Sequence, residues 1–365
     1  IFILDAMGVP FIVTTLVILI LILLYTFEGG VKTIVYTDTL QTTFMLGGMI
    51  ICIWALMDKL DMGLLRTFTA LGEQGYTKIF NTDYNSAGFF VKQILGGAFI
   101  TITMTGLDQE MMQKNISVKT LGGSQKNVVT LSFILLLVNI LFLFLGGLLY
   151  LYAGKEGLNL KGDDIFPGIA LGNHLTSAIG IIFIIGLISA LFPSADGALT
   201  AMTSSFCIDI LGMQKDTVSK KKKKKNKRLK VHLSFTLIFF LLVLLFKWID
   251  DKSIIDVILK LAGYTYGPLL GMFAFGIFTR RKVRDHLVIW VCLMSPLFIL
   301  GLDVANNSEW FIRKLAISEP IAGSLTNFTR TLFGDFKLGI EILILNGLVT
   351  FAGLWTISEK RSTDA

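Results

Sequence analysis

Long runs of apolar residues dominate the chain, and short polar connections separate them. A helix of about 20 residues rises about 30 Å, which matches the hydrocarbon thickness of a bilayer. The runs have about this length. The pattern therefore predicts an all-α integral membrane protein with about nine transmembrane helices, over Pro10–Glu28, Lys32–Met57, Gly88–Thr105, Asn127–Ala153, Asn173–Leu211, Leu229–Trp248, Ser253–Phe278, Leu287–Leu302 and Gly339–Ile357.

The composition supports a membrane protein. Of 365 residues, 53% are hydrophobic and 16% are charged, with a mean hydropathy of +0.71 that lies outside the usual soluble range. None of the connections between the apolar runs is long enough to form a separate soluble domain. We therefore expect residues 1–365 to form a single transmembrane domain.

The distribution of Lys and Arg predicts the orientation, because short basic loops stay in the cytoplasm. One set of alternate connections carries 20 basic residues, whereas the other carries 10 together with 14 acidic residues. The first set is therefore assigned to the cytoplasm. On this assignment the chain is multi-pass in the cell membrane, with its N-terminal end outside and its C-terminal end inside.

The most basic connection is the loop 212–230, which contains the run Lys220–Lys225. Such a run is compatible with nucleic acid or with anionic lipid headgroups. Its position between two predicted spans favours a cytoplasmic anchor at the lipid headgroups, so membrane lipids are expected partners and nucleic acid is not. The chain begins with Ile1 and enters its first span after a short lead, and we expect further sequence upstream.

Ionisable residues at membrane depth are costly, so each is a functional candidate unless a partner or an interface explains it. Asp256 and Lys260 lie four residues apart on one predicted helix, where they can pair. Glu341 lies near a helix start and can reach the interface. Asp38 and Asp196 remain. Asp38 is compatible with an interfacial position, whereas Asp196 lies where apolar bulk gives way to small and hydroxyl residues.

Small residues around Asp196 form one stripe at helical spacing, which is typical both of helix packing and of a ligand site. Pro193 favours the second interpretation, because a proline inside a helix frees the carbonyl four residues earlier, that of Ser189. Freed carbonyls, a hydroxyl and a carboxylate are ligands for an alkali cation, as at the disturbed helices of transporters. The stripe comprises Ala190, Pro193, Ser194, Gly197, Ala201 and Ser204.

Three local patterns resemble the sodium:solute symporter family, which includes the sodium/glucose cotransporters. Gly29-Gly30 followed by Tyr36-Thr37-Asp38-Thr39-Leu40-Gln41 resembles the GG…YTDTLQ segment of its core helix five. Asp108-Gln109 with Gln113-Lys114 resembles the end of core helix six. Ser189–Leu211 resembles core helix eight, with Phe206-Cys207-Ile208-Asp209-Ile210 where relatives carry F-T-M-D-I.

The resemblance implies a LeuT-like inverted-repeat fold, in which the nine spans are core helices four to ten plus two trailing helices. Core helices one to three would lie upstream, and because helix one completes the sites in the family, we expect this chain alone not to transport. The implied function is sodium-coupled uptake of a small organic solute by alternating access. Sodium is then the coupling ion, and no other metal or cofactor is expected.

The resemblance also implies positions for sodium. Those of the main site fall on the Ala190 carbonyl, Pro193 and Ser194, of which Pro193 lacks the expected hydroxyl. Those of a second site fall on Asp38, Asp196 and Gly197, with a carboxylate at Asp196 in place of a hydroxyl. Our hypothesis is that the Ser189 carbonyl offsets the lost hydroxyl and that Asp196 strengthens the second site or is protonated within it.

For the solute, the implied positions are Thr101, Met104, Thr105 and Lys260. The family's sugar-binding Gln of core helix ten falls near Leu259 and Lys260, so a glucose-type pocket is not favoured. Lys260 would suit a carboxylic or sialic acid if Asp256 did not engage it. The expected solute is a sugar, a carboxylic or sialic acid, an amino acid or a vitamin.

Three alternatives stay open. A proton-coupled carrier of the same fold and a non-transporting sensor share the hydrophobic pattern. An intramembrane enzyme would need a nucleophile, a base or metal ligands together at membrane depth. The scattered cysteines and histidines do not predict such a site, and we expect no enzymatic activity; they are Cys52, Cys207, Cys292, His174, His232 and His286.

Overall fold

The computed structural model describes residues 10–28, 31–160, 162–172, 174–213, 221–249, 254–308 and 319–360. The chain forms two compact units, each built from two separate stretches of sequence. The first unit comprises Ile1–Thr77 with Gln113–Lys252, and the second comprises Lys78–Met112 with Ser253–Ala365.

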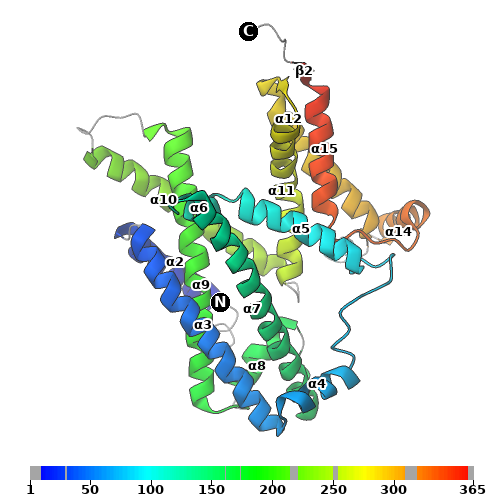
Figure 1. Ribbon diagram of the computed structural model, residues 1–365. Helices are drawn as coiled ribbons and strands as arrows, with labels where there is room; N and C mark the ends of the chain where they lie inside the picture. The colour runs from blue at the N-terminus through cyan, green and yellow to red at the C-terminus, as the bar shows by residue number, and fades with distance from the viewer. Residues whose placement is uncertain are drawn as a thin grey trace. The chain divides into compact units, whose positions relative to one another are not determined.

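The regular elements of the first unit are helices in its described residues, and short connections join them (Figure 1). A short 3₁₀ helix, η1, precedes α8, and a π-helical turn, η2, follows α9. Its elements are α2 (Phe11–Glu28), α3 (Val31–Leu60), α4 (Leu64–Glu73), α7 (Leu121–Lys155), η1 (Gly162–Asp164), α8 (Ile165–Leu171), α9 (Ser177–Ser205), η2 (Phe206–Ile210) and α10 (Lys221–Ile249).

The second unit combines helices with one two-stranded antiparallel ladder. The short helix α6 (Gln109–Ile116) crosses the sequence boundary between the two units. The other elements are α5 (Phe90–Gly106), α11 (Ile254–Phe278), β1 (Arg281–Val283), α12 (Asp285–Asn306), α14 (Glu319–Phe333), α15 (Ile342–Thr356) and β2 (Ser358–Lys360).

A helix lies over each of the nine ranges predicted from hydrophobicity. The boundaries differ most at α10, which begins at Lys221, eight residues earlier than predicted. Helix α7 begins six residues earlier than predicted, because the Thr120 hydroxyl caps it by accepting the Gly123 N–H at 3.1 Å. The predicted range Asn173–Leu211 is divided. Asn173 itself lies outside the described residues, α9 begins at Ser177, and the last turn is π-helical.

Six helices are long and apolar enough to cross a membrane within the described part of the chain. They are Asp38–Leu60, Leu121–Lys155, Ser177–Ile210, Lys225–Leu245, Ile258–Phe278 and Asp285–Asn306. Two shorter apolar helices cover Phe11–Leu24 and Ile342–Thr356. The all-α membrane class agrees with these helices, apart from the two short strands, while the count of nine spans stays a prediction.

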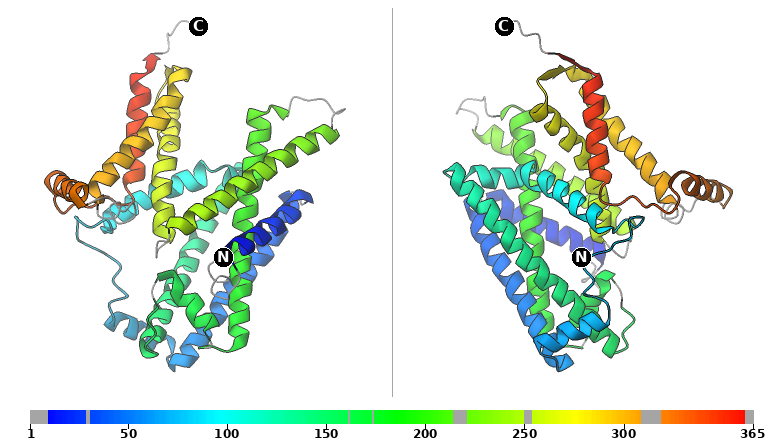
Figure 2. Two further views of the ribbon diagram at one scale, coloured as in Figure 1. Left: turned by 180° about the vertical axis from the view of Figure 1, so that it is seen from behind. Right: turned by 45° about the vertical axis from the view of Figure 1, so that its right-hand side comes forward.

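Close packing of α3 against α9 organises the first unit (Figure 2). A Cβ added at Gly48 would lie 3.4 Å from the Ile182 carbonyl oxygen, and one at Gly186 would lie 3.9 Å from Met45. Residue numbers fall along α3 as they rise along α9, so the two helices are antiparallel. A core of fully buried side chains, including Leu56, Leu148 and Ile169, joins α3 to α7 and α8.

In the second unit α11 and α15 meet along a seam of glycines. A Cβ added at Gly267 would lie 2.3 Å from the Asn346 Cβ, so only glycine allows this approach. Pro268 has no N–H for the Tyr264 carbonyl, and the Asn346 Nδ2 donates to that carbonyl at 2.8 Å. The buried Ser295 hydroxyl of α12 donates to the Asn346 Oδ1 at 2.6 Å, which ties three helices together.

Candidate functional site

The antiparallel packing of α3 and α9 determines where Asp38 lies along the pair. Gly48 contacts Ile182. Ten residues back along α3 is Asp38, and ten residues on along α9 is Phe192. Because both helices rise about 1.5 Å per residue, Asp38 lies about 15 Å along α3 from Gly48, toward the same end of the pair as the sequence-predicted sodium positions on α9.

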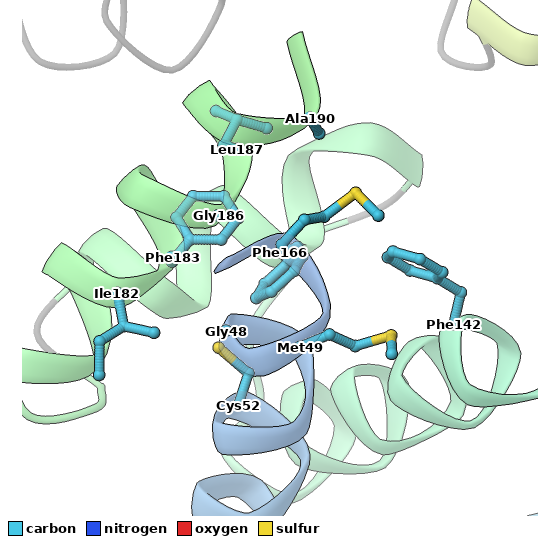
Figure 3. A pocket seen from close by; sticks show the side chains of 11 residues that line it. Gly48, Met49, Cys52, Phe142, Phe166, Ile182, Phe183, Gly186, Leu187 and Ala190 are labelled. Atoms are coloured by element: carbon cyan, nitrogen blue, oxygen red, sulfur yellow. The ribbon is translucent and has the colours of Figure 1, made fainter. Parts of the chain in front are cut away.

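The positions assigned to the main sodium site differ in exposure. Ala190 and Ser194 are exposed, whereas Ser189 is buried. The backbone of Pro193 continues the helix, but its side chain lies outside the described residues. Ala190 also borders an apolar cavity of about 170 Å³ between α3, α7, α8 and α9, in which Figure 3 shows carbon and sulfur side chains pointing inward. The Ala190 carbonyl and the Ser194 hydroxyl are hard oxygen donors that suit an alkali cation.

Asp196 is completely buried in α9, and Gly197 beside it is buried too. Thr200 and Thr203 follow Asp196 at four and seven residues, so they continue one polar stripe along the helix. The Thr200 hydroxyl donates to the Asp196 carbonyl oxygen at 2.6 Å. A carboxylate buried among helices fits the expectation that Asp196 is costly at membrane depth.

Sequence reasoning gave His232 no role, yet the structure places it at the end of this polar stripe. Its Nδ1 lies 2.9 Å from the Thr203 hydroxyl, and both side chains are buried between α9 and α10. The signal in the sequence is weak. Thr203 lies on the face of Asp196, but nothing in the spacing of His232 from α9 identifies the pairing.

In the second unit Lys260 pairs with a residue that the sequence did not single out. Its Nζ lies 2.7 Å from the Oδ2 of Asp303, a fully buried carboxylate on α12. The Tyr264 hydroxyl donates to the same oxygen, and the Asn307 Nδ2 donates to Oδ1 at 2.6 Å. The predicted partner Asp256 lies on α11, but its side chain lies outside the described residues.

The other three positions assigned to the solute lie on α5. Thr101 and Met104 are exposed and Thr105 is half-buried. The Thr101 hydroxyl donates to the Gly97 carbonyl oxygen at 2.9 Å, as is usual for a threonine inside a helix. None of the three lines the cavity around Lys260. The predicted sodium residues therefore all belong to the first unit, and the predicted solute residues all belong to the second unit.

Comparison with known proteins gives relatives that are named as transporters. The sodium/sialic acid symporter SiaT of Proteus mirabilis (strain HI4320) is 24% identical over 334 residues, which are 88% of this chain and 66% of that protein. The sodium/sialic acid symporter NanT of Aliivibrio fischeri (strain ATCC 700601 / ES114) is 24% identical over 303 residues, 80% of this chain and 58% of that protein.

A protein of Drosophila melanogaster named as a sodium-dependent multivitamin transporter is 22% identical over 361 residues, 92% of this chain and 59% of that protein. The chain thus spans less than two thirds of the length of these relatives. The model of one family, described as Sodium:solute symporter family, matches residues 1–285. This match confirms the family inferred from the three sequence patterns, and the chain belongs to the sodium:solute symporter family.

Proposed function

We propose that the whole protein couples the entry of sodium to the uptake of a small organic solute by alternating access, on a LeuT-like inverted-repeat fold. Family membership supports transport rather than an enzymatic reaction. The observation that carries the coupling ion is the complete burial of the Asp196 carboxylate in α9, the helix that packs antiparallel against α3, on which Asp38 lies.

Two sodium sites follow from this arrangement. The main site takes oxygen from the Ala190 carbonyl and the Ser194 hydroxyl, and the Ser189 carbonyl freed by Pro193 replaces the missing hydroxyl. The second site is formed by Asp38, Asp196 and the backbone at Gly197. Both sites use hard oxygen donors at a disturbed helix, which is how such transporters bind sodium.

The solute class is a second part of the proposal. The relatives are named for sialic acid and for vitamins. The candidate solutes are therefore a carboxylic or sialic acid and a vitamin, together with a sugar and an amino acid. Thr101, Met104 and Thr105 are proposed to contact the solute. Lys260 is the fourth position. Its ammonium group already pairs with the Asp303 carboxylate, and this pairing affects whether Lys260 binds an anionic or an uncharged solute.

Uptake by the whole protein in proteoliposomes tests the coupling. We expect an inward sodium gradient to drive uptake of at least one labelled compound from a panel of N-acetylneuraminate, glucose, proline and biotin. Asp38→Asn and Asp196→Asn should each raise the sodium concentration for half-maximal uptake and lower the Hill slope, because sodium loses a charged ligand. Ser194→Ala should also weaken the sodium response.

Two exposed residues provide matched controls. Asp209→Asn lies at η2 and Ser234→Ala lies on α10, and both should leave the sodium response unchanged. If Asp196→Asn keeps the wild-type sodium response and Hill slope, Asp196 is not a sodium ligand. Uptake driven by a proton gradient without sodium would favour the proton-coupled alternative, which the complete burial of Asp196 also fits.

A further inference from the structure

An apolar cavity of about 170 Å³ lies inside the first unit, between α3, α7, α8 and α9. Every residue that lines it is apolar or a glycine, apart from the thiol of Cys52, and Figure 3 shows the carbon and sulfur side chains around one space. A water molecule needs about two to four polar partners to fill such a space. The cavity therefore suits an apolar group and not water.

The size of the cavity limits the size of its occupant. An apolar cavity of about 150 Å³ in a protein core stays dry and binds benzene or xenon. The cavity between α3, α7, α8 and α9 is slightly larger. It can therefore hold a group of about six carbon atoms, such as the terminal part of a hydrocarbon chain.

The position of the cavity along the helices identifies which hydrocarbon is available. Met49 and Cys52 lie around the middle of the candidate span Asp38–Leu60. The lining residues of α7 and α9 lie within the candidate spans Leu121–Lys155 and Ser177–Ile210. At the middle of a span the bilayer contains acyl chains and neither water nor headgroups. The apolar group present at this depth is the end of a lipid acyl chain.

The cavity is open on one side and closed on the other. Phe142 is 40% exposed and Leu187 is 37% exposed, and both line the cavity, whereas Cys52 is 1% exposed. Helix α7, which carries Phe142, is apolar on all sides, as is typical of a helix that faces acyl chains. A chain end can therefore enter beside Phe142 and Leu187 and reach Cys52.

The free energy of occupancy comes from packing. Lipid tails are as apolar as leucine, so moving a chain end from the bilayer into the cavity gains little from the hydrophobic effect. The side chains around an empty cavity lack dispersion contacts on one side, and an occupant restores these contacts. Met45 and Met49 can adapt to the shape of a chain, because methionine is flexible and its sulfur is polarisable.

We propose that this cavity is a lipid-binding site, in which the end of one acyl chain enters between Phe142 and Leu187 and lies against Met49 and Cys52. The site is separate from the proposed solute positions, which belong to the second unit. Occupancy requires neither sodium nor solute, so the test is independent of transport.

Photo-crosslinking of the whole purified protein in nanodiscs of phosphatidylcholine tests the proposal. The probe is phosphatidylcholine with a diazirine at the end of one acyl chain, and peptide mass spectrometry identifies the labelled residues. We expect labelling of Met49 and Cys52, which are buried, so that a lipid outside the helices does not reach them. A probe with the diazirine beside the glycerol ester should not label them, because that group lies near the headgroups.

Two comparisons show whether the labelling depends on the cavity. Leu56 lies one turn beyond Cys52, is fully buried and does not line the cavity, so it should remain unlabelled. Leu187→Trp places an indole ring at the opening and should lower the labelling of Cys52 by about tenfold or more, because two groups cannot occupy one volume. Leu137→Trp is the matched control on the exposed surface of α7, and it should leave the labelling unchanged.

Gly186→Ala is a second variant that keeps the test decisive if thermal unfolding shows that Leu187→Trp does not fold. A Cβ added at Gly186 would first meet Met45 of the cavity wall, at 3.9 Å, so the methyl group fits and narrows the cavity. It should lower the labelling of Cys52 by about twofold. Gly146→Ala on α7 is its control, because a Cβ at Gly146 meets nothing within 4 Å.

Three results would overturn the proposal: no labelling of Met49 or Cys52 by the chain-end probe, equal labelling of Cys52 and Leu56, or labelling of Cys52 in the narrowed variants that equals that in their controls. The first result is also expected if apolar side chains from elsewhere in the whole protein fill the cavity. In that case too, the result excludes a lipid from the site.

Discussion

Asp303 shows how tertiary structure selects the partner of a buried charge. The sequence indicates that Lys260 needs a partner at membrane depth, and helical spacing offers Asp256. The structure adds a carboxylate on another helix, 43 positions along the chain, at 2.7 Å. Such a distance in sequence has no local signature, so the need for a partner was predictable and Asp303 was not.

Removing one member of this pair should destabilise the protein strongly. Asp303→Asn removes the carboxylate charge beside the Lys260 ammonium, and breaking a buried ion pair costs about 3–5 kcal/mol. Tyr264→Phe removes only a hydroxyl donor, which costs about 1 kcal/mol. Thermal unfolding in detergent should rank the two variants in this order. Equal unfolding temperatures for Asp303→Asn and the unaltered protein would contradict a structural pair.

The sequence predicts Asp196 as a site residue, but it does not predict His232. Asp196 is conspicuous because a carboxylate interrupts an apolar run, and the structure buries it completely. His232 is inconspicuous, because a histidine near a basic loop is common at a helix end. Its contact with Thr203 depends on the pairing of α9 with α10, which hydrophobic periodicity does not specify.

At the scale of elements, hydrophobic runs predict helices well because one run long enough to span a bilayer is sufficient evidence for one span. Hydrophobic runs do not predict which helices pack against each other. The seam between α11 and α15 depends on which faces of the helices carry glycine, and on Asn346 reaching the carbonyl that Pro268 leaves free. Short helices such as α4 and α8 lie in connections that have no long apolar run.

Gly267→Ala should destabilise the protein by about 1–3 kcal/mol, because the new methyl group would overlap the Cβ of Asn346. Gly276→Ala on the same helix is the matched control. A Cβ at Gly276 meets nothing within 4 Å, and alanine favours the helix by about 0.5–1 kcal/mol. Unfolding temperatures should therefore shift in opposite directions, and a similar shift for both variants would contradict the seam.

The β1–β2 ladder carries a titratable ion pair that should respond to acid. The Arg284 guanidinium donates to Glu359 at 2.6 Å and holds the pKa of that carboxyl below its ordinary value of 4.5. Because the pKa is lower in the folded protein than in the unfolded one, the contribution to stability is present above the ordinary value. It is lost as the pH falls through the lowered pKa.

Carboxyl titration of Glu359 by NMR measures this shift directly. Arg284→Gln should return the pKa of Glu359 toward its ordinary value, whereas Arg330→Gln, on α14, should leave it unchanged. The protection factors of the amides in 281–283, corrected for the intrinsic pH dependence of exchange, should also fall below the midpoint of the titration. A Glu359 pKa that does not change in Arg284→Gln would show that the pair does not form in solution.

At the scale of the whole molecule, the charge pattern and the structure of the second unit agree without depending on each other. The cavity around Lys260 gathers four helix ends that the basic residues assign to the outside. The β1–β2 ladder joins two connections that they assign to the cytoplasm. The orientation itself stays a prediction from counting charges, whereas the ladder could not be predicted, since each strand has only three residues.

Cysteine labelling tests the predicted orientation. In a variant whose three native cysteines are replaced, single cysteines at Lys78 and Asp335 should react with an impermeant maleimide added to intact cells. Cysteines at Lys227 and Lys282 should react only after the membrane is opened. All four positions are exposed, so accessibility from each side decides the result. Labelling of Lys282 in intact cells would reverse or reject the orientation.

The ladder between β1 and β2 also has a mechanical consequence. It fastens the turn that joins α11 to α12 to the residues that follow α15, and the guanidinium of Arg281 reinforces it with bonds to both the hydroxyl and the carbonyl oxygen of Ser358. Backbone hydrogen bonds of the ladder thus connect one end of the group formed by α11, α12 and α15, while the other end of the group surrounds a cavity. If these helices separate, they must therefore pivot about the end that the ladder connects. The largest displacement then occurs at the end where the cavity lies.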